Sequence, residues 1–141
     1  MNCLNGSESF ALDSSVLLFD YFCGGSQRVR PVLKEGLLND VTIAETLYVI
    51  CRTDGEENAA NYVEKCARTV RAIAPSEKLS RLAGSMKCKF SISLADCWVL
   101  ATGIVFKVPC LFGFREAELV KNLGAISDHV EVKFLDELAP S

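Results

Sequence analysis

Four carboxylates stand where an apolar segment ends or a helix is about to begin: Asp13, Glu45, Asp96 and Glu116. In a sheet of parallel strands, such junctions meet at one edge of the sheet. Carboxylates that are brought together repel one another unless a cation lies between them. We therefore predict that these four side chains form a metal site.

The types of ligand indicate which metal it would be. Oxygen ligands without histidine or cysteine suit Mg²⁺ or Mn²⁺, which are hard cations and keep several waters. These ions usually act on phosphates: they polarise a phosphoryl oxygen, lower the pKa of a bound water and hold the attacking and leaving oxygens in line. The acids therefore predict chemistry on a phosphate ester.

Helix capping is the alternative explanation of these acids. The segments Thr42–Glu45 and Ser93–Asp96 both have a hydroxyl followed three residues later by an acid, as in a capping box. Asp13 alone could be a turn residue, and Glu116 alone a solvated residue of a first helical turn. Capping and metal binding are compatible, because a helix N-terminus that holds a carboxylate can also direct it toward an ion. As a set, the four acids favour the metal site.

Other reaction types find little support. The single histidine, His129, is far in sequence from any plausible serine or cysteine partner, which disfavours a catalytic triad. No dinucleotide-binding glycine motif or P-loop is present.

The cysteines form no closely spaced pair, which disfavours a structural zinc site. Most of them are expected to be buried thiols, and Cys97 and Cys110 are the clearest cases. One or two disulfides would be expected only if the source is a hyperthermophile. The seven cysteines are at positions 3, 23, 51, 66, 88, 97 and 110.

Length and composition predict one domain over residues 1–141, with a sizeable hydrophobic core. Half of the residues are apolar and the mean hydropathy is +0.23, so surplus apolar surface is expected in an oligomer interface. No apolar run reaches the roughly 18–20 residues of a membrane span, and the first ten residues lack the pattern of a signal peptide. A cytoplasmic protein is expected. The net charge is −3, but basic residues form local clusters along the chain. These clusters are either solvated helix faces or contacts to phosphates.

The hydrophobic pattern predicts strands that alternate with helices. Strands are predicted at 9–13, 37–41, 108–113 and 129–135, and helices at 14–23, 27–37, 42–53, 56–73, 76–87, 94–107 and 115–123. Residues 88–92 are either a strand or a connector. This order predicts an α/β fold: a single three-layer domain with a mainly parallel, four- or five-stranded sheet flanked by helices.

Three stretches resemble the PIN-domain family, in particular the VapC-type toxin ribonucleases of VapBC toxin–antitoxin systems. They are FALDSSVLL with Asp13, IAETLYVICRTDG with Glu45, and SLADCWVLATG with Asp96. The third stretch is the most specific, because the small residues Ala101 and Gly103 follow the acid and allow close packing. The resemblance covers nearly the whole chain and implies a PIN-like fold.

The fourth motif departs from the family pattern. Many members have a Thr-x-Asp after the fourth strand, where this chain reads LFGFREAEL. Glu116 is our choice for the fourth acid, with Glu118 and Asp128 as the alternatives. In the family arrangement Asp13 and Asp96 would ligate the metal, and Glu45 and Glu116 would act directly or through water.

The resemblance also implies an activity and partners. It implies an endoribonuclease dependent on Mg²⁺ or Mn²⁺, a homodimer, and a cognate antitoxin that places a basic side chain among the acids. Ser14 would orient Asp13 or the attacking water, and Ser93 would contact the substrate; both could equally be helix caps.

Two other functions remain open. The altered fourth motif is compatible with a PIN-like module that binds RNA or a partner through a degenerate metal site. A phosphatase or phosphotransfer regulator on a doubly wound sheet would also bind Mg²⁺ through acids. That class needs a lysine near the end of a later strand, and Lys107 and Lys133 are poorly placed for this role.

Overall fold

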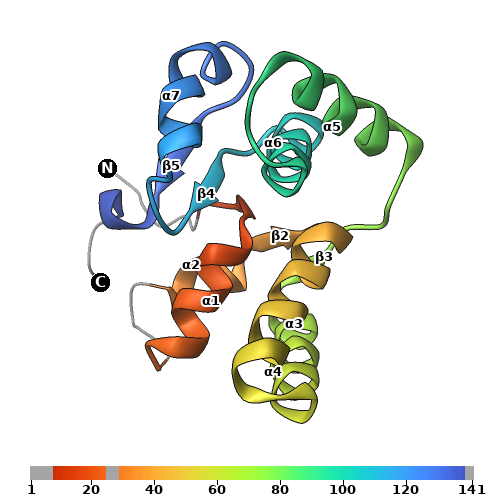
Figure 1. Cartoon of the computed structure of the whole chain (residues 1–141), viewed down its shortest axis with the longest axis vertical. Coiled ribbons are helices and arrows are strands. Elements are labelled where there is room, and N and C mark those ends of the chain that lie inside the picture. The colour runs from red at the N-terminus through yellow and green to blue at the C-terminus, as the bar shows by residue number, and fades with distance from the viewer. Residues whose placement is uncertain (1–7, 25–28, 139–141) are drawn as a thin grey trace.

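The computed structural model describes residues 8–24 and 29–138, which build a five-stranded parallel sheet flanked by helices (Figure 1). The elements in chain order are β1 (Phe10–Leu12), α1 (Ser14–Phe22), α2 (Arg30–Lys34), β2 (Gly36–Leu38), α3 (Asp40–Asp54), α4 (Glu56–Thr69), β3 (Arg71–Ala72), α5 (Glu77–Lys89), α6 (Leu94–Phe106), β4 (Cys110–Phe112), α7 (Ala117–Ile126), β5 (Val132–Phe134) and the 3₁₀ helix η2 (Leu135–Glu137). This is the α/β architecture predicted from the sequence.

The strand order is β3-β2-β1-β4-β5, and all neighbours run parallel. The chain builds one half of the sheet outward from β1 to β3 and then crosses over to add β4 and β5 on the other side of β1. This order places the topological switch point between β1 and β4, where Ala11 pairs with Cys110. In open α/β sheets, ligands bind at this point, beyond the carboxyl ends of the strands.

Two hydrophobic clusters on opposite faces of the sheet make up the core. Phe10 and Leu12 of β1 join residues of α1 to α4, whereas Ala11 joins residues of α5, α6 and α7. Successive strand residues point to opposite faces, so a strand buried on both sides reads as an uninterrupted apolar run. The three-layer arrangement follows directly from this division.

The predicted elements are confirmed in most places, with three corrections. The predicted helix 27–37 is helical only over α2, because Gly36 already begins β2; residues 27 and 28 lie outside the described part of the chain. The helix predicted at 56–73 ends at Thr69, and the edge strand β3 follows it. In the segment 88–92, the first two residues extend α5 and the remainder is a connector. Short strands of this kind carry too few residues to show a period.

The small residues of α6 do permit close packing. A Cβ atom on Gly103 would lie 2.5 Å from the Sγ atom of Cys110 on β4, so no larger residue fits without a shift.

Cys97 and Cys110 are fully buried thiols, as predicted, and burial raises the pKa of Cys97 to about 11. The six cysteines among the described residues are free, and Cys3 lies outside them. Within the same residues, the helices are too short or too polar to cross a membrane.

Candidate metal centre

Asp13 lies at the switch point, directly after β1. Its backbone N–H donates to the carbonyl oxygen of Leu111 on β4 (2.9 Å), which places Asp13 between the two central strands. Its Oδ2 atom caps α1 by accepting from the Ser15 N–H (3.1 Å) and the Ser15 hydroxyl (2.5 Å). Burial raises the pKa of Asp13 to about 6, the Ser15 hydrogen bonds oppose the rise, and the charges of Glu45 and Glu116 add to it. The carboxyl group is therefore destabilised as an anion.

Asp96 lies in the first turn of α6, where the charges of Asp13, Glu45 and Glu116 act on it. The Ser93 side chain caps this helix by accepting from the Asp96 N–H (3.1 Å), as the sequence alternative proposed. Burial raises the pKa of Asp96 to about 7, followed by the charges of Asp13 and Glu116, and Glu45 contributes less. Four acids from four separate segments thus act on one another at the carboxyl edge of the sheet.

Glu45 reaches this edge from the second turn of α3. The Ser14 hydroxyl donates to its Oε1 atom (2.5 Å), so Ser14 orients Glu45, whereas the hydroxyl that holds Asp13 belongs to Ser15. The capping box expected at Thr42–Glu45 is wrong, because α3 begins at Asp40 and its N-cap is Asn39. Glu45 therefore has no capping role.

Sequence reasoning missed three buried polar residues that fix this edge. The Asn39 Oδ1 atom accepts from the Thr42 N–H (2.8 Å), and its Nδ2 atom donates to the Thr102 hydroxyl (3.3 Å), which joins α3 to α6. Ser15 joins α1 to β4, because its hydroxyl also accepts from the Gly113 N–H (2.7 Å). Asn39 could have been found as a preferred N-cap residue before Asp40; the partners of Ser15 and Thr102 are too distant in sequence to be read.

Glu116 is the N-cap residue of α7, is exposed, and makes no capping hydrogen bond with its side chain. Its charge raises the pKa of both Asp13 and Asp96. Glu118 instead accepts from the Ser91 hydroxyl at 3.5 Å. Asp128 follows α7 and precedes β5, at the opposite edge of the sheet. Of the three candidates for the fourth acid, Glu116 is the one whose charge contributes to the raised pKa values of Asp13 and Asp96.

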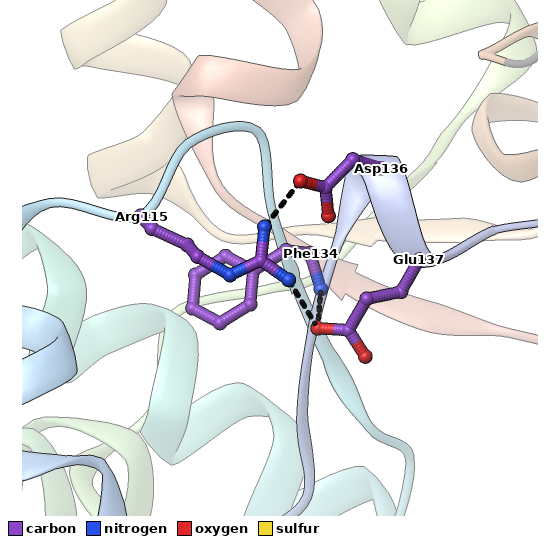
Figure 2. Close-up of polar contacts among 4 residues, drawn as sticks. All are labelled: Arg115, Phe134, Asp136 and Glu137. Carbon is purple, nitrogen blue, oxygen red and sulfur yellow. Dashed lines mark hydrogen bonds and ion pairs between the residues drawn. The ribbon is translucent and has the colours of Figure 1, made fainter.

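The nearest cation along the chain to Glu116 is engaged elsewhere. Figure 2 shows the Arg115 guanidinium bonded to Asp136 and Glu137 of η2, and lying over the Phe134 ring at 4.5 Å. The main causes of the raised pKa values at Asp13 and Asp96 include no cationic side chain.

The chemistry of the site fits a hard divalent cation. Its donors are carboxylates with hydroxyl partners, the oxygen ligands that Mg²⁺ and Mn²⁺ prefer. Within residues 8–24 and 29–138, no group of three or more His, Cys, Asp and Glu side chains is already spaced as the ligand set of one ion. A cavity of about 430 Å³ lies elsewhere, against α1, α2 and α4, and none of the four acids lines it.

A family model describes most of this chain. The model of the PIN domain matches residues 10–112, which include β1, β4 and three of the four acids. The chain belongs to the PIN-domain family. Among curated proteins, none matches the sequence significantly.

Several solved structures share this fold at very low sequence identity. VapBC from Salmonella typhimurium, bound to DNA, aligns over 92% of this chain and 99% of its own with a TM-score of 0.71 and 9% identity. VapBC-1 from nontypeable Haemophilus influenzae covers 91% and 98%, with a TM-score of 0.65 and 14% identity. VapC20 from Mycobacterium tuberculosis, a toxin that cleaves the sarcin–ricin loop, covers 81% and 94%, with a TM-score of 0.62 and 12% identity. The shared feature is the fold of nearly the whole chain.

Proposed function

We propose that this PIN-domain protein is a Mg²⁺- or Mn²⁺-dependent endoribonuclease that hydrolyses RNA phosphodiester bonds, as the toxin of a toxin–antitoxin pair. One observation carries the proposal: the pKa values of Asp13 and Asp96 are raised by burial and by the charges of one another's neighbouring acids, which come from four separate segments at the switch point. Family membership supports nuclease chemistry, and the neighbouring VapBC structures support the toxin role.

Asp13 and Asp96 are the residues that would hold the ion, with Glu45 and Glu116 acting directly or through water. A bound divalent ion supplies a water of lowered pKa and polarises a phosphoryl oxygen. Ser15 fixes Asp13 and Ser14 fixes Glu45, so these two hydroxyls orient the acids. Metal binding would release protons, since Asp13 and Asp96 must both ionise before they can act as ligands.

The direct test is an RNA cleavage assay with purified protein in Mg²⁺ or Mn²⁺. We expect cleavage by the wild type and none by the Asp96→Asn variant, whose fold should be intact by circular dichroism. Asp128→Asn is the matched control, because it makes the same chemical change at the opposite edge of the sheet. Equal activity of wild type and Asp96→Asn would refute the proposal.

The identity of the fourth acid is tested by a second pair of variants. Glu116→Gln should lower activity, since the Glu116 charge acts on both Asp13 and Asp96, whereas Glu118→Gln should leave activity near the wild-type level. The reverse result would assign the fourth position to Glu118.

The proposed partners follow from the same role. We expect a homodimer in the cytoplasm and a cognate antitoxin, encoded by a short neighbouring reading frame, that places a basic side chain among the acids. Co-expression of both frames should yield a complex that cleaves no RNA until the antitoxin is removed. A toxin that stays fully active in the complex would count against this pairing.

The second candidate is an RNA- or partner-binding module with a degenerate metal site. The observation in its favour is Glu116 itself, which is exposed and makes no capping bond where many relatives carry a Thr-x-Asp motif. Calorimetry separates the two candidates. Absence of Mn²⁺ binding at millimolar concentration, with RNA binding retained, would favour the binding module.

A further inference from the structure

An exposed aromatic residue, Phe114, belongs to the segment that joins β4 to Glu116. Phe114 is 55% exposed, the largest exposed fraction among the large hydrophobic residues described. It lies in the segment between β4 and α7, one residue after Gly113 and two before Glu116. A solvent-exposed ring offers apolar surface that a bound ligand can cover, and this one is carried by the segment that leads from β4 to Glu116.

Contacts on both sides of Phe114 hold this segment in place. On one side, the Gly113 N–H donates to the Ser15 hydroxyl that also holds Asp13, and a Cβ atom on Gly113 would lie 2.9 Å from the backbone of Ser15. On the other side, Arg115 is fastened to Asp136 and Glu137 (Figure 2). The backbone that carries Phe114 is therefore fixed relative to Asp13 before any substrate arrives.

Electrostatics explain why a nuclease would need an uncharged contact here. Four acids converge at this edge and the chain carries a net charge of −3, so the site repels the phosphates of RNA until a cation binds. Stacking of a base on an aromatic ring does not depend on charge and accepts any base. Single-stranded RNA offers unstacked bases for such contacts.

We propose that Phe114 is the platform on which a base of single-stranded RNA stacks, next to the phosphate that lies over the acids. This inference rests on the proposed ribonuclease function and adds a residue that positions the substrate. Phe22 provides a matched control, since it is 49% exposed but lies at the far end of α1 from Asp13.

The test uses the full chain and a short RNA that contains 2-aminopurine, whose fluorescence falls when the base stacks on an aromatic ring. We expect Phe114→Ala to lose this quenching and to lower kcat/KM by about tenfold, mainly through a higher KM. Phe114→Trp should retain both signals, Phe114→Leu should behave like the alanine variant, and Phe22→Ala should match the wild type.

Separate readouts distinguish the two proposals. If the wild type fails to cleave RNA but its quenching still depends on Phe114, the stacking site stands and the ribonuclease proposal fails. If Phe114→Ala keeps wild-type quenching and KM, the stacking proposal is overturned while cleavage is unaffected. A Phe114→Ala variant that changes only its oligomeric state or antitoxin binding, measured by light scattering, would also overturn it and assign Phe114 to a protein interface.

Discussion

Two groups of acids in this protein differ in whether a cation of the same chain balances their charge. Asp136 and Glu137 of η2 enclose the guanidinium of Arg115, so their charges are balanced by a cation of the chain itself. Asp13 is buried, Asp96 is partly buried, and both are influenced by further carboxylates; the main causes of their pKa shifts include no cationic side chain. The carboxylates of the first group are paired with a cation of the protein itself, whereas no such cation is a main influence on the second group.

This difference agrees with the proposal that the first group stabilises structure and the second binds a metal ion. The ion pairs of Arg115 are exposed and hold η2 against the segment 113–116. The proximity of Asp13 and Asp96 to other acids makes their ionisation costly, and a bound divalent cation would lower that cost. Variants that remove these charges test the distinction, and the largest effect should come from Asp13 and Asp96.

Loss of a buried acid should have the largest effect on activity. Asp13→Asn should lower kcat/KM for RNA by more than about a hundredfold, because it removes a proposed ligand and not only a supporting group. Asp136→Asn in the balanced group makes the same chemical change and should stay close to wild type. Comparable losses in the two variants would remove the functional distinction between the groups.

Loss of the hydroxyl that holds Asp13 should come next. Ser15→Ala removes two hydrogen bonds, to the Asp13 carboxylate and from the Gly113 N–H, and should reduce activity by about 10–100-fold. Steady-state kinetics of RNA cleavage at saturating Mg²⁺ would measure this loss of activity, with Ser80→Ala on the exposed face of α5 as the control. Wild-type activity in Ser15→Ala would show that Asp13 needs no such support.

Divalent metal should stabilise the folded protein. At a concentration of one hundred times Kd, Mg²⁺ or Mn²⁺ should add about 2.7 kcal/mol to the free energy of unfolding, visible as a rise in Tm. The Asp13→Asn/Asp96→Asn double variant should show no such rise. A rise of the same size in the double variant would place the metal at another site.

Without metal, stability should fall as the pH rises. The folded-state pKa values of about 6 for Asp13 and about 7 for Asp96 exceed the ordinary value of 3.8, so the folded protein binds these protons more tightly than the unfolded chain does. The contribution of these two protonated carboxyl groups to the free energy of unfolding is fully present below about pH 4. It is lost as the pH rises through 6 and 7, which lowers the free energy of unfolding by an amount on the order of a few kcal/mol. Urea unfolding from pH 4 to 8 measures it, and the double Asn variant should remove this part of the slope.

Removal of Arg115 should have the smallest effect. Arg115→Ala frees Asp136 and Glu137 and loosens the segment that carries Glu116, so we expect a loss of activity of about tenfold or less. Arg81→Ala, which breaks an exposed ion pair with Glu77 on α5, is the control and should leave activity unchanged. A loss as large as that of Asp13→Asn would mean that Arg115 acts in the site itself.

The long, strongly patterned elements could be predicted from the sequence, and the shortest ones could not. The buried helix at 94–107 and the apolar strand at 108–113 appear as α6 and β4, because their runs are long or almost wholly apolar. The strand β3 and the start of α3 were missed. Two residues of edge strand show no period, and the N-cap at Asn39 was assigned instead to Thr42.

For the site, the sequence by itself determined the residue types: carboxylates at strand–helix junctions, without histidine or cysteine, and a parallel α/β sheet to bring them together. Only the tertiary structure decided the partners. Ser15 rather than Ser14 holds Asp13, and Ser14 holds Glu45. Glu116 rather than Glu118 raises the pKa values of Asp13 and Asp96. Local patterns fix which residue types stand at a junction, but hydrogen bonds across 31 or 98 residues arise only when the strand order brings distant segments to one edge.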